Sequence, residues 1–151
     1  FGHSPGGQVV HRSALLGGKK NVDVIAVANS GWFTMPDRDI DYPYGIKNVG
    51  ITDEELGEAF AKPVILFMGE KDVERKPPFR DTPEADAQGM NRMERCTNYF
   101  RQCKAKAEEL RVPFRWKLET VEGAAHQGVK MAEGAAAYIF GKSSEDRNRR
   151  V

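Results

Sequence analysis

The pattern of apolar and polar positions along the chain predicts strands that alternate with helices. Two apolar runs, 22–28 (VDVIAVA) and 63–68 (PVILFM), are typical of short strands that are buried on both faces of a sheet. Residues 114–121 instead alternate apolar with charged side chains, which predicts a strand near a sheet edge. Because helical segments separate these strands, we expect crossover connections and a parallel sheet of the α/β class.

Helical spacing of apolar residues predicts the segments between the strands. A first helix covers residues 6–16, and Thr52, followed three residues later by a glutamate, begins a short helix with a capping box. Thr82 is expected to cap one long helix that continues to Leu110, and a last helix covers residues 129–140. The long helix carries a single apolar stripe with gaps of three and four residues: Met93, Cys96, Phe100, Cys103, Ala107 and Leu110.

Two segments lack such periodicity. Residues 29–51 are rich in glycine, proline, asparagine and aspartate and also hold several aromatic residues. Together with the short helix after them, residues 29–62 are expected to form a cap-like excursion from the sheet. Residues 142–151 are polar and charged, and we expect a flexible tail.

Composition narrows the classes of function. The 151 residues are 40% hydrophobic and 30% charged with a formal net charge of +1, which is typical of a globular domain. This balance gives no general attraction to nucleic acid, and no apolar run is long enough to cross a bilayer, so we expect neither as a partner. Cys96 and Cys103 are seven residues apart on one predicted helix, so their Cα atoms are expected to lie roughly 10 Å apart, which is too far for a disulfide. Two buried thiols favour the reducing cytoplasm, but they do not determine the compartment.

Residues 2–6 hold the first candidate for chemistry. Gly2-His3-Ser4-Pro5-Gly6 matches the pattern G-x-S-x-G, and a predicted helix follows directly. In a nucleophile elbow, this pattern forms a sharp strand-to-helix turn that exposes the serine. Both flanking glycines are then expected because the turn leaves no room for a Cβ atom. The pentapeptide alone is equally consistent with a glycine-rich turn that holds an incidental serine.

Two further residues complete a candidate catalytic triad in the sequence. A serine nucleophile needs a base, and the base needs a carboxylate that orients it. Asp72 follows the strongest predicted strand, and His126 lies in a loop of small residues before the last helix. Since the carboxyl ends of parallel strands meet at one edge of a sheet, Ser4, Asp72 and His126 are expected to converge there. Glu70 and Glu74 are the alternatives for the carboxylate.

At this point the sequence resembles the α/β-hydrolase superfamily. The segments GHSPGG, PVILFMGEKD and VEGAAHQG are similar to its elbow, its acid turn and its histidine loop. The wider pattern, with GQVVHR, ANSGWFTMP, YPYGI, DTPEADAQG and VKMAEGAAAYIFG, is similar to bacterial serine esterases related to poly(3-hydroxybutyrate) depolymerases. The resemblance implies hydrolysis of a small or polymeric ester by an acyl-enzyme on Ser4, with His126 as base, Asp72 as its orienting carboxylate, and no cofactor or metal. It does not separate esters from amides or peptides.

The sequence departs from the family pattern at two places. Pro5 follows the candidate nucleophile, where the family uses a backbone N–H as one donor of the oxyanion hole, and proline has no N–H. This leaves open a weakened enzyme, a hole built from other donors, or a non-catalytic protein with the hydrolase fold. In the family the elbow also follows the fifth strand, which would end at Phe1. Residues 1–141 are therefore expected to be the C-terminal half of the fold, with its N-terminal half as a required partner and poor stability without it.

Four aromatic or imidazole side chains are candidates for the substrate pocket. Trp32, Phe33 and Tyr44 lie in the excursion and could line an acyl pocket, and covering the sheet edge is the equal alternative. His3 occupies the variable position before Ser4, where local packing is the simpler expectation. His11 has no acidic or cysteine partner at the spacing of metal ligands and is expected to be an ordinary helix residue.

Overall fold

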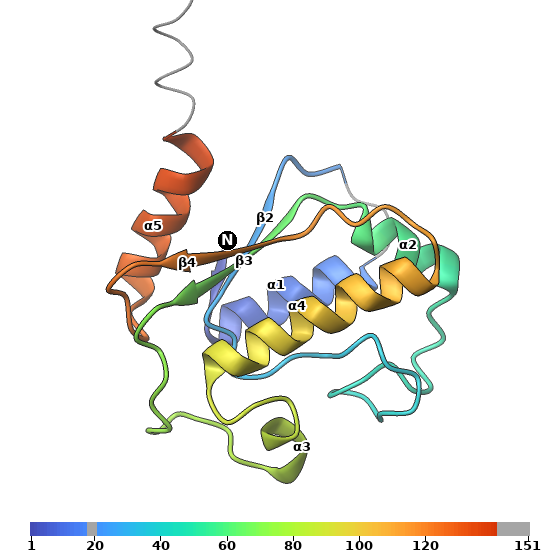
Figure 1. Ribbon diagram of the computed structural model, residues 1–151, viewed down its shortest axis with the longest axis horizontal. Helices are drawn as coiled ribbons and strands as arrows, with labels where there is room; N and C mark the ends of the chain where they lie inside the picture. The colour runs from blue at the N-terminus through green and yellow to red at the C-terminus, as the bar shows by residue number, and fades with distance from the viewer. Residues whose placement is uncertain (18–20, 142–151) are drawn as a thin grey trace, which may run out of the picture.

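The computed structural model describes residues 1–17 and 21–141, which contain a four-stranded parallel sheet in the order β1-β2-β3-β4 (Figure 1). The predicted tail, 142–151, lies outside the described residues. The strands are β1 (Gly2–His3), β2 (Ile25–Ala28), β3 (Val64–Gly69) and β4 (Lys117–Val121). Every pair of neighbours is parallel, with Val27 opposite Leu66 and Leu66 opposite Leu118. The predicted α/β class is confirmed, and β4 lies at an edge of the described sheet as its alternating pattern indicates.

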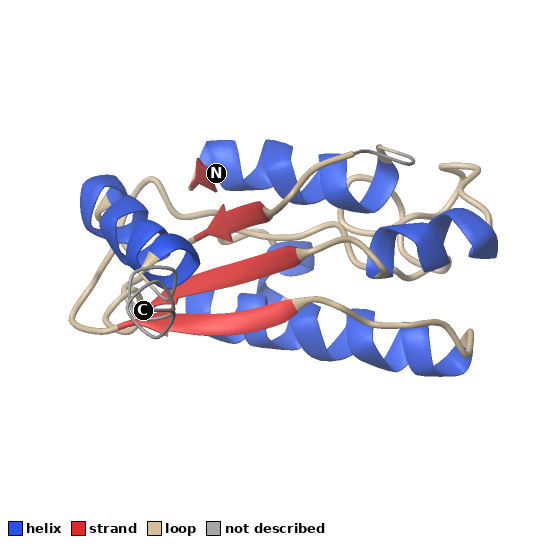
Figure 2. Ribbon diagram, turned by 90° about the horizontal axis from the view of Figure 1, so that it is seen from above, coloured by secondary structure: helices blue, strands red, loops and turns tan. Residues whose placement is uncertain are grey.

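Helices cover the two faces of this sheet. They are α1 (Pro5–Leu16), α2 (Asp53–Phe60), α3 (Pro83–Asp86), α4 (Arg92–Glu109) and α5 (Gly128–Phe140). Alternate strand residues separate two cores, because Val27 and Leu66 pack with α1, α2 and α4, whereas Ala26 and Phe67 pack with α5. Figure 2 shows α5 apart from the other helices. The strands thus end between two helical layers.

The short helix α2 begins as its sequence predicts. The hydroxyl of Thr52 accepts a hydrogen bond from the backbone N–H of Glu55 at 3.2 Å, and the Glu55 carboxylate accepts one from the N–H of Thr52 at 2.8 Å. The capping box is therefore confirmed.

The prediction of one long helix from Thr82 to Leu110 is wrong, because the chain breaks between α3 and α4. Gly89 has a φ of +147°, a conformation that other residues rarely adopt, and a Cβ there would lie 2.7 Å from the Cβ of Glu94. Asn91 then caps α4 by accepting a hydrogen bond from the N–H of Glu94 at 2.9 Å. The apolar stripe is confirmed within α4, where Cys96, Cys103 and Ala107 are buried.

Strand boundaries also differ from the sequence pattern. Residues 22–24 and 114–116 were expected in strands, but β2 begins at Ile25 and β4 at Lys117. The backbone of Arg115 bonds instead to the carbonyl of Phe60, and Trp116 packs in the core. At the other end of the sheet, β1 includes His3, whereas the expected strand ended at Phe1.

His11 joins α1 to the excursion and is fully buried. Its Nδ1–H donates to the carbonyl of Gly7 at 3.1 Å, and its Nε2 accepts from the backbone N–H of Thr34 at 3.0 Å. Because Nε2 accepts a hydrogen bond, the ring must be neutral. Burial, and after it the charge of Arg12, lowers the pKa of His11 from 6.5 to about 3. The side chain is thus a structural link between two segments, beyond the ordinary helix role expected of it.

This buried histidine predicts a specific sensitivity to acid. Because its folded pKa lies below its unfolded value, its contribution to stability is present above pH 6.5 and is lost as the pH falls toward 3. Between pH 7 and 5 the loss amounts to about 2 kcal/mol of unfolding free energy. Denaturant titrations of the wild type and of His11→Gln at both pH values measure it, and we expect the wild type to lose about 2 kcal/mol more than the variant. Equal losses would contradict this assignment.

Candidate active site

Ser4 lies in a sharp turn between β1 and α1. Its φ of +55° and ψ of −115° place a serine in a region that residues with a Cβ rarely occupy. The turn is held from both sides, since the N–H of Ser4 donates to the carbonyl of Ala28 at 2.9 Å and its carbonyl accepts from the N–H of Gln8 at 3.1 Å. The neighbouring strand and the first turn of α1 therefore hold the serine in its strained conformation.

The glycines around this turn differ in how much room their surroundings leave for a Cβ atom. A Cβ on Gly2 would lie 2.7 Å from a methyl carbon of Val10, so this glycine is required as predicted. The corresponding prediction for Gly6 is wrong, because a Cβ there would meet nothing within 4 Å. The second crowded position is Gly7, where a Cβ would lie 2.6 Å from the hydroxyl of Ser30. Close packing thus falls one residue beyond the pentapeptide.

The structure brings Ser4, Asp72 and His126 into one chain of hydrogen bonds at the carboxyl edge of the sheet. Nε2 of His126 lies 2.9 Å from the hydroxyl of Ser4, and its Nδ1 lies 2.7 Å from Oδ2 of Asp72. Since a carboxylate only accepts, the Nδ1–H donates to Asp72 and Nε2 is left to accept from the serine. The alternatives for the acid have other partners, because Glu70 accepts from the N–H of Gly123 and Glu74 pairs with Lys76.

Asn29 connects the strand ends that carry these residues. It directly follows β2, is 4% exposed, and has a φ of +45°. Its amide donates to the carbonyl of Ala125 at 3.1 Å and accepts from the N–H of Gly69 at 2.8 Å. The side chain therefore joins the end of β3 to the loop of His126. The sequence pattern did not single out Asn29, although a polar residue directly after a buried strand indicates a position at the functional edge of the sheet.

Arg92 holds the second oxygen of Asp72. Its Nη1 donates to Oδ1 of Asp72 at 3.1 Å and its Nη2 to the carbonyl of Pro78 at 3.0 Å, and both charged side chains are almost fully buried. The pattern analysis missed this residue because it lay inside the supposed long helix. One signal was present, since a cation in the first turn of a helix is disfavoured unless a carboxylate compensates it.

Two cavities meet beside the candidate triad. One, of about 410 Å³, is lined by Ser4 and Pro5, and the other, of about 390 Å³, is lined by Asp72 and His126. They share a wall formed by Pro77, Pro78 and Arg92. Space therefore exists on both the serine side and the histidine side of the reacting groups.

The four expected pocket residues take different places. Trp32 lines the cavity of Ser4, and Tyr44 packs against the Trp32 ring at 4.7 Å without lining that cavity. Phe33 does not reach it, because its ring is fully buried against Tyr99. His3 packs beside His126 with ring centres 4.8 Å apart, and burial, followed by the charge of His126, lowers the pKa of His3. Of the four expected pocket residues, Trp32 alone lines the cavity next to Ser4.

Pro5 occupies the first position of α1 and is exposed. Proline is favourable there for the helix, but its nitrogen carries no hydrogen to donate. Among the described residues, no group of three or more histidine, cysteine, aspartate or glutamate side chains could hold a metal ion. None of the described helices has the length and apolar character needed to cross a membrane.

Comparison with solved structures identifies the fold. The chain superimposes on poly(aspartic acid) hydrolase-1 from Sphingomonas sp. KT-1 with a TM-score of 0.86 and 36% identity, covering 89% of this chain and 51% of that one. It superimposes on LpqC, a poly(3-hydroxybutyrate) depolymerase from Bordetella parapertussis, with a TM-score of 0.83 and 31% identity, covering 93% and 48%. The chain has an α/β-hydrolase fold. This α/β-hydrolase chain spans about half the length of both structures. Comparisons with protein-family models and with curated proteins gave no match.

Proposed function

We propose that this α/β-hydrolase chain cleaves carboxylic esters through an acyl-enzyme on Ser4. The observation that carries the proposal is the continuous hydrogen-bonded chain from the Ser4 hydroxyl through His126 to the buried Asp72. A hydroxyl becomes an effective nucleophile when an oriented base takes its proton. The names of the two superimposed proteins, a poly(aspartic acid) hydrolase and a poly(3-hydroxybutyrate) depolymerase, support hydrolysis and include polymers among the substrates to be considered.

The geometry indicates the role of each group. Nε2 of His126 takes the proton of Ser4 as the oxygen attacks the ester carbonyl, and then gives it to the departing alcohol oxygen. Asp72 holds the ring in the required tautomer and stabilises the imidazolium that forms. Water then repeats the sequence on the acyl-serine, which releases the carboxylic acid and restores Ser4.

One observation favours a second candidate, a non-catalytic protein with the hydrolase fold. The residue after Ser4 is a proline, so the N–H that this position gives to an oxyanion hole is absent. Such a protein would keep the hydrogen-bonded triad and use the cavity beside Ser4 for binding alone.

Labelling with a fluorophosphonate tests the two candidates. We expect one phosphonyl group per chain, located on Ser4 by peptide mass spectrometry, and complete loss of labelling in Ser4→Ala. The matched control is Ser13→Ala on the same helix, which should label as the wild type does. An unlabelled wild type that retains its fold by circular dichroism would favour the non-catalytic protein, and labelling that persists in Ser4→Ala would contradict the assignment of the nucleophile. A matched pair, 4-nitrophenyl butyrate and N-butyryl-4-nitroaniline, then separates ester from amide hydrolysis.

A further inference from the structure

The cavity beside Ser4 is positively charged. Its lining includes Arg80 and Arg92 together with Trp32 and Phe79, and no acidic side chain. This contrasts with the whole chain, in which 23 basic and 22 acidic residues nearly balance. The excess of positive charge at this cavity is therefore local and follows from how the arginines are placed.

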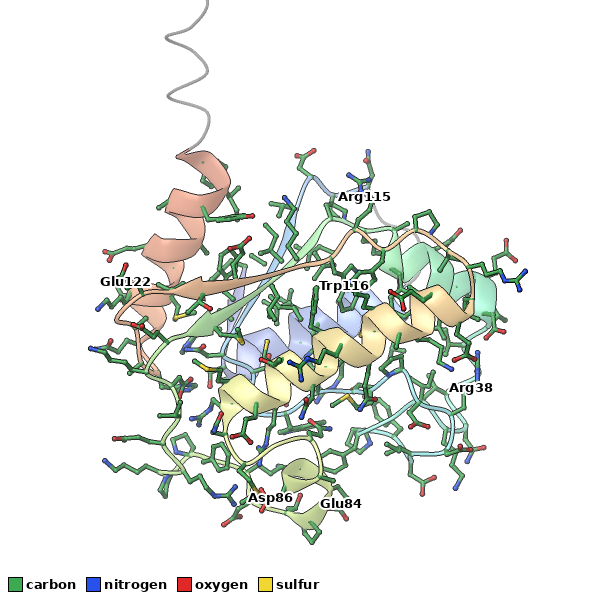
Figure 3. All side chains as sticks on the ribbon, viewed as in Figure 1. Arg38, Glu84, Asp86, Arg115, Trp116 and Glu122 are labelled. Carbon is green, nitrogen blue, oxygen red and sulfur yellow. The ribbon has the colours of Figure 1, made fainter. Side chains whose placement is uncertain are left out.

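The carboxylates near this cavity form no ion pair with Arg80 among the described residues. Asp72 bonds to Arg92 and His126, and Asp86 on α3 accepts from Arg75 at 2.9 Å and from Arg95 at 2.7 Å (Figure 3). Asp81, next to Arg80 in the chain, does not line the cavity and has no ion pair within 4 Å among the described residues. These carboxylates thus leave the face of the cavity uncompensated.

Arg12 and Arg80 flank Trp32, and each lacks a carboxylate partner within the described part of the chain. Both guanidinium groups lie over the ring of Trp32, at 4.5 and 5.2 Å from its centre, and neither has an ion-pair partner within 4 Å among the described residues. Arg80 donates only to the Tyr44 hydroxyl at 3.0 Å, and Arg12 bonds to the neutral side chains of Thr34 and Gln8. Their charges therefore remain available to an anion at the Trp32 wall.

The backbone of this wall is held by a buried arginine. Arg95 is 0% exposed and donates to the carbonyl of Gly31 at 2.6 Å and to that of Arg80 at 2.9 Å. Those two residues both line the cavity. Nearby, the buried Nε of Arg92 has no hydrogen-bond partner within the described part of the chain. The positive face is thus preorganised, with one donor unused.

The reaction geometry assigns this cavity to the acyl part of a substrate. The leaving alcohol must receive its proton from Nε2 of His126, and His126 lines the other cavity. The cavity of Arg80 and Trp32 is lined by Ser4, Pro5 and Gln8, on the opposite side of the shared proline wall. An acyl chain bound to Ser4 would therefore extend toward Arg80 and the Trp32 wall.

We propose that Arg80, supported by Arg12 and Arg92, binds a carboxylate carried by the acyl group of the substrate. The class of substrate is then the half-ester of a dicarboxylic acid, or a polymer with acidic units, rather than a plain fatty acyl ester. Guanidinium groups match carboxylates in geometry, and such charge-assisted bonds are stronger than neutral ones. This inference rests on the proposed function for its catalytic test, whereas its binding test is independent of catalysis.

The catalytic test uses two esters that differ only at the end of the acyl chain, mono(4-nitrophenyl) adipate and 4-nitrophenyl hexanoate. We expect kcat/KM for the adipate to exceed that for the hexanoate by roughly tenfold or more at low salt. Arg80→Gln should remove most of this preference, as should 0.5 M NaCl. The matched control is Arg115→Gln, because Arg115 is also exposed and lines a separate cavity away from Asp86 (Figure 3), and it should change neither rate. An equal preference in wild type and Arg80→Gln would overturn the proposal.

A binding test examines the carboxylate site at Arg80 separately from the proposed hydrolysis at Ser4. Titration calorimetry of the same chain with adipamate, which carries one carboxylate, and with hexanamide, which carries none, should show adipamate binding roughly tenfold more tightly, with the difference lost in Arg80→Gln and retained in Arg115→Gln. If neither ester is cleaved and no fluorophosphonate labelling occurs, the proposed hydrolysis fails while this titration still decides the carboxylate site. Equal affinities for adipamate and hexanamide would overturn the site whatever the catalytic result.

Discussion

Replacing Asp72 by asparagine is expected to lower kcat for ester hydrolysis by about 10,000-fold. In the wild type, the carboxylate accepts from Nδ1–H of His126 and leaves Nε2 free to take the proton of Ser4. The other oxygen of Asp72 is already occupied by Arg92. An asparagine would therefore present its amide N–H groups to Nδ1, favour the tautomer with the proton on Nε2, and remove the base.

The size of this loss distinguishes a tautomer effect from unfolding. Asp72 is buried and paired, so thermal melts of Asp72→Asn must accompany the kinetics, with rates measured well below the melting temperature. Asp53→Asn is the matched control, because Asp53 is exposed at the start of α2 and pairs only with Arg38 among the described residues, so its kcat should equal that of the wild type. A folded Asp72→Asn with a kcat within tenfold of the wild type would contradict the role given to Asp72.

Replacing Pro5 by alanine is expected to raise kcat by roughly 100-fold. Alanine restores a backbone N–H at the position where the elbow supplies an oxyanion donor, and one such donor is worth about 100- to 1,000-fold. The first position of α1 tolerates the change, since its N–H has no partner within the helix in any case.

A second proline at the start of a helix provides the control. Pro83 occupies the first position of α3, and Pro83→Ala should leave kcat unchanged while having the same effect on helix geometry. An unchanged kcat in Pro5→Ala would show that another donor already stabilises the oxyanion, and would contradict the view that Pro5 limits the rate.

The hydrophobic pattern predicted the order of the helices and strands. Apolar residues recur every three or four positions along a helix that buries one face, and they form a continuous run in a strand that is buried on both faces. Buried runs such as 63–68 have no other stable environment than a covered sheet. The break before α4 escaped prediction, because helical spacing in 93–110 is compatible with a longer helix, and the deciding features are one unusual φ at Gly89 and one cap at Asn91. The backbone conformation at these two residues therefore determines where α4 begins, and the spacing of apolar residues carries no information about that conformation.

The residues of the candidate triad could be named from the sequence because a nucleophile, an acid and a base follow the strand ends in the order of a known fold. Their supporting groups could not. Asn29 and Arg92 act through contacts with residues 14 to 96 positions away, and no local pattern encodes such distances. The same holds for Arg12 and Arg80, which are 68 positions apart in the chain and both lie over the ring of Trp32. The expected N-terminal half of the fold stays a prediction.

The central claim, an acyl-enzyme on Ser4, is tested most directly by trapping that intermediate. The chain is mixed with 4-nitrophenyl hexanoate, quenched in acid within seconds, digested with trypsin, and analysed by mass spectrometry. We predict one hexanoyl group on the peptide of residues 1–12, attached to Ser4 and absent from Ser4→Ala. Release of nitrophenol by the wild type with no acyl group on that peptide, or with the same release by Ser4→Ala, would contradict the mechanism.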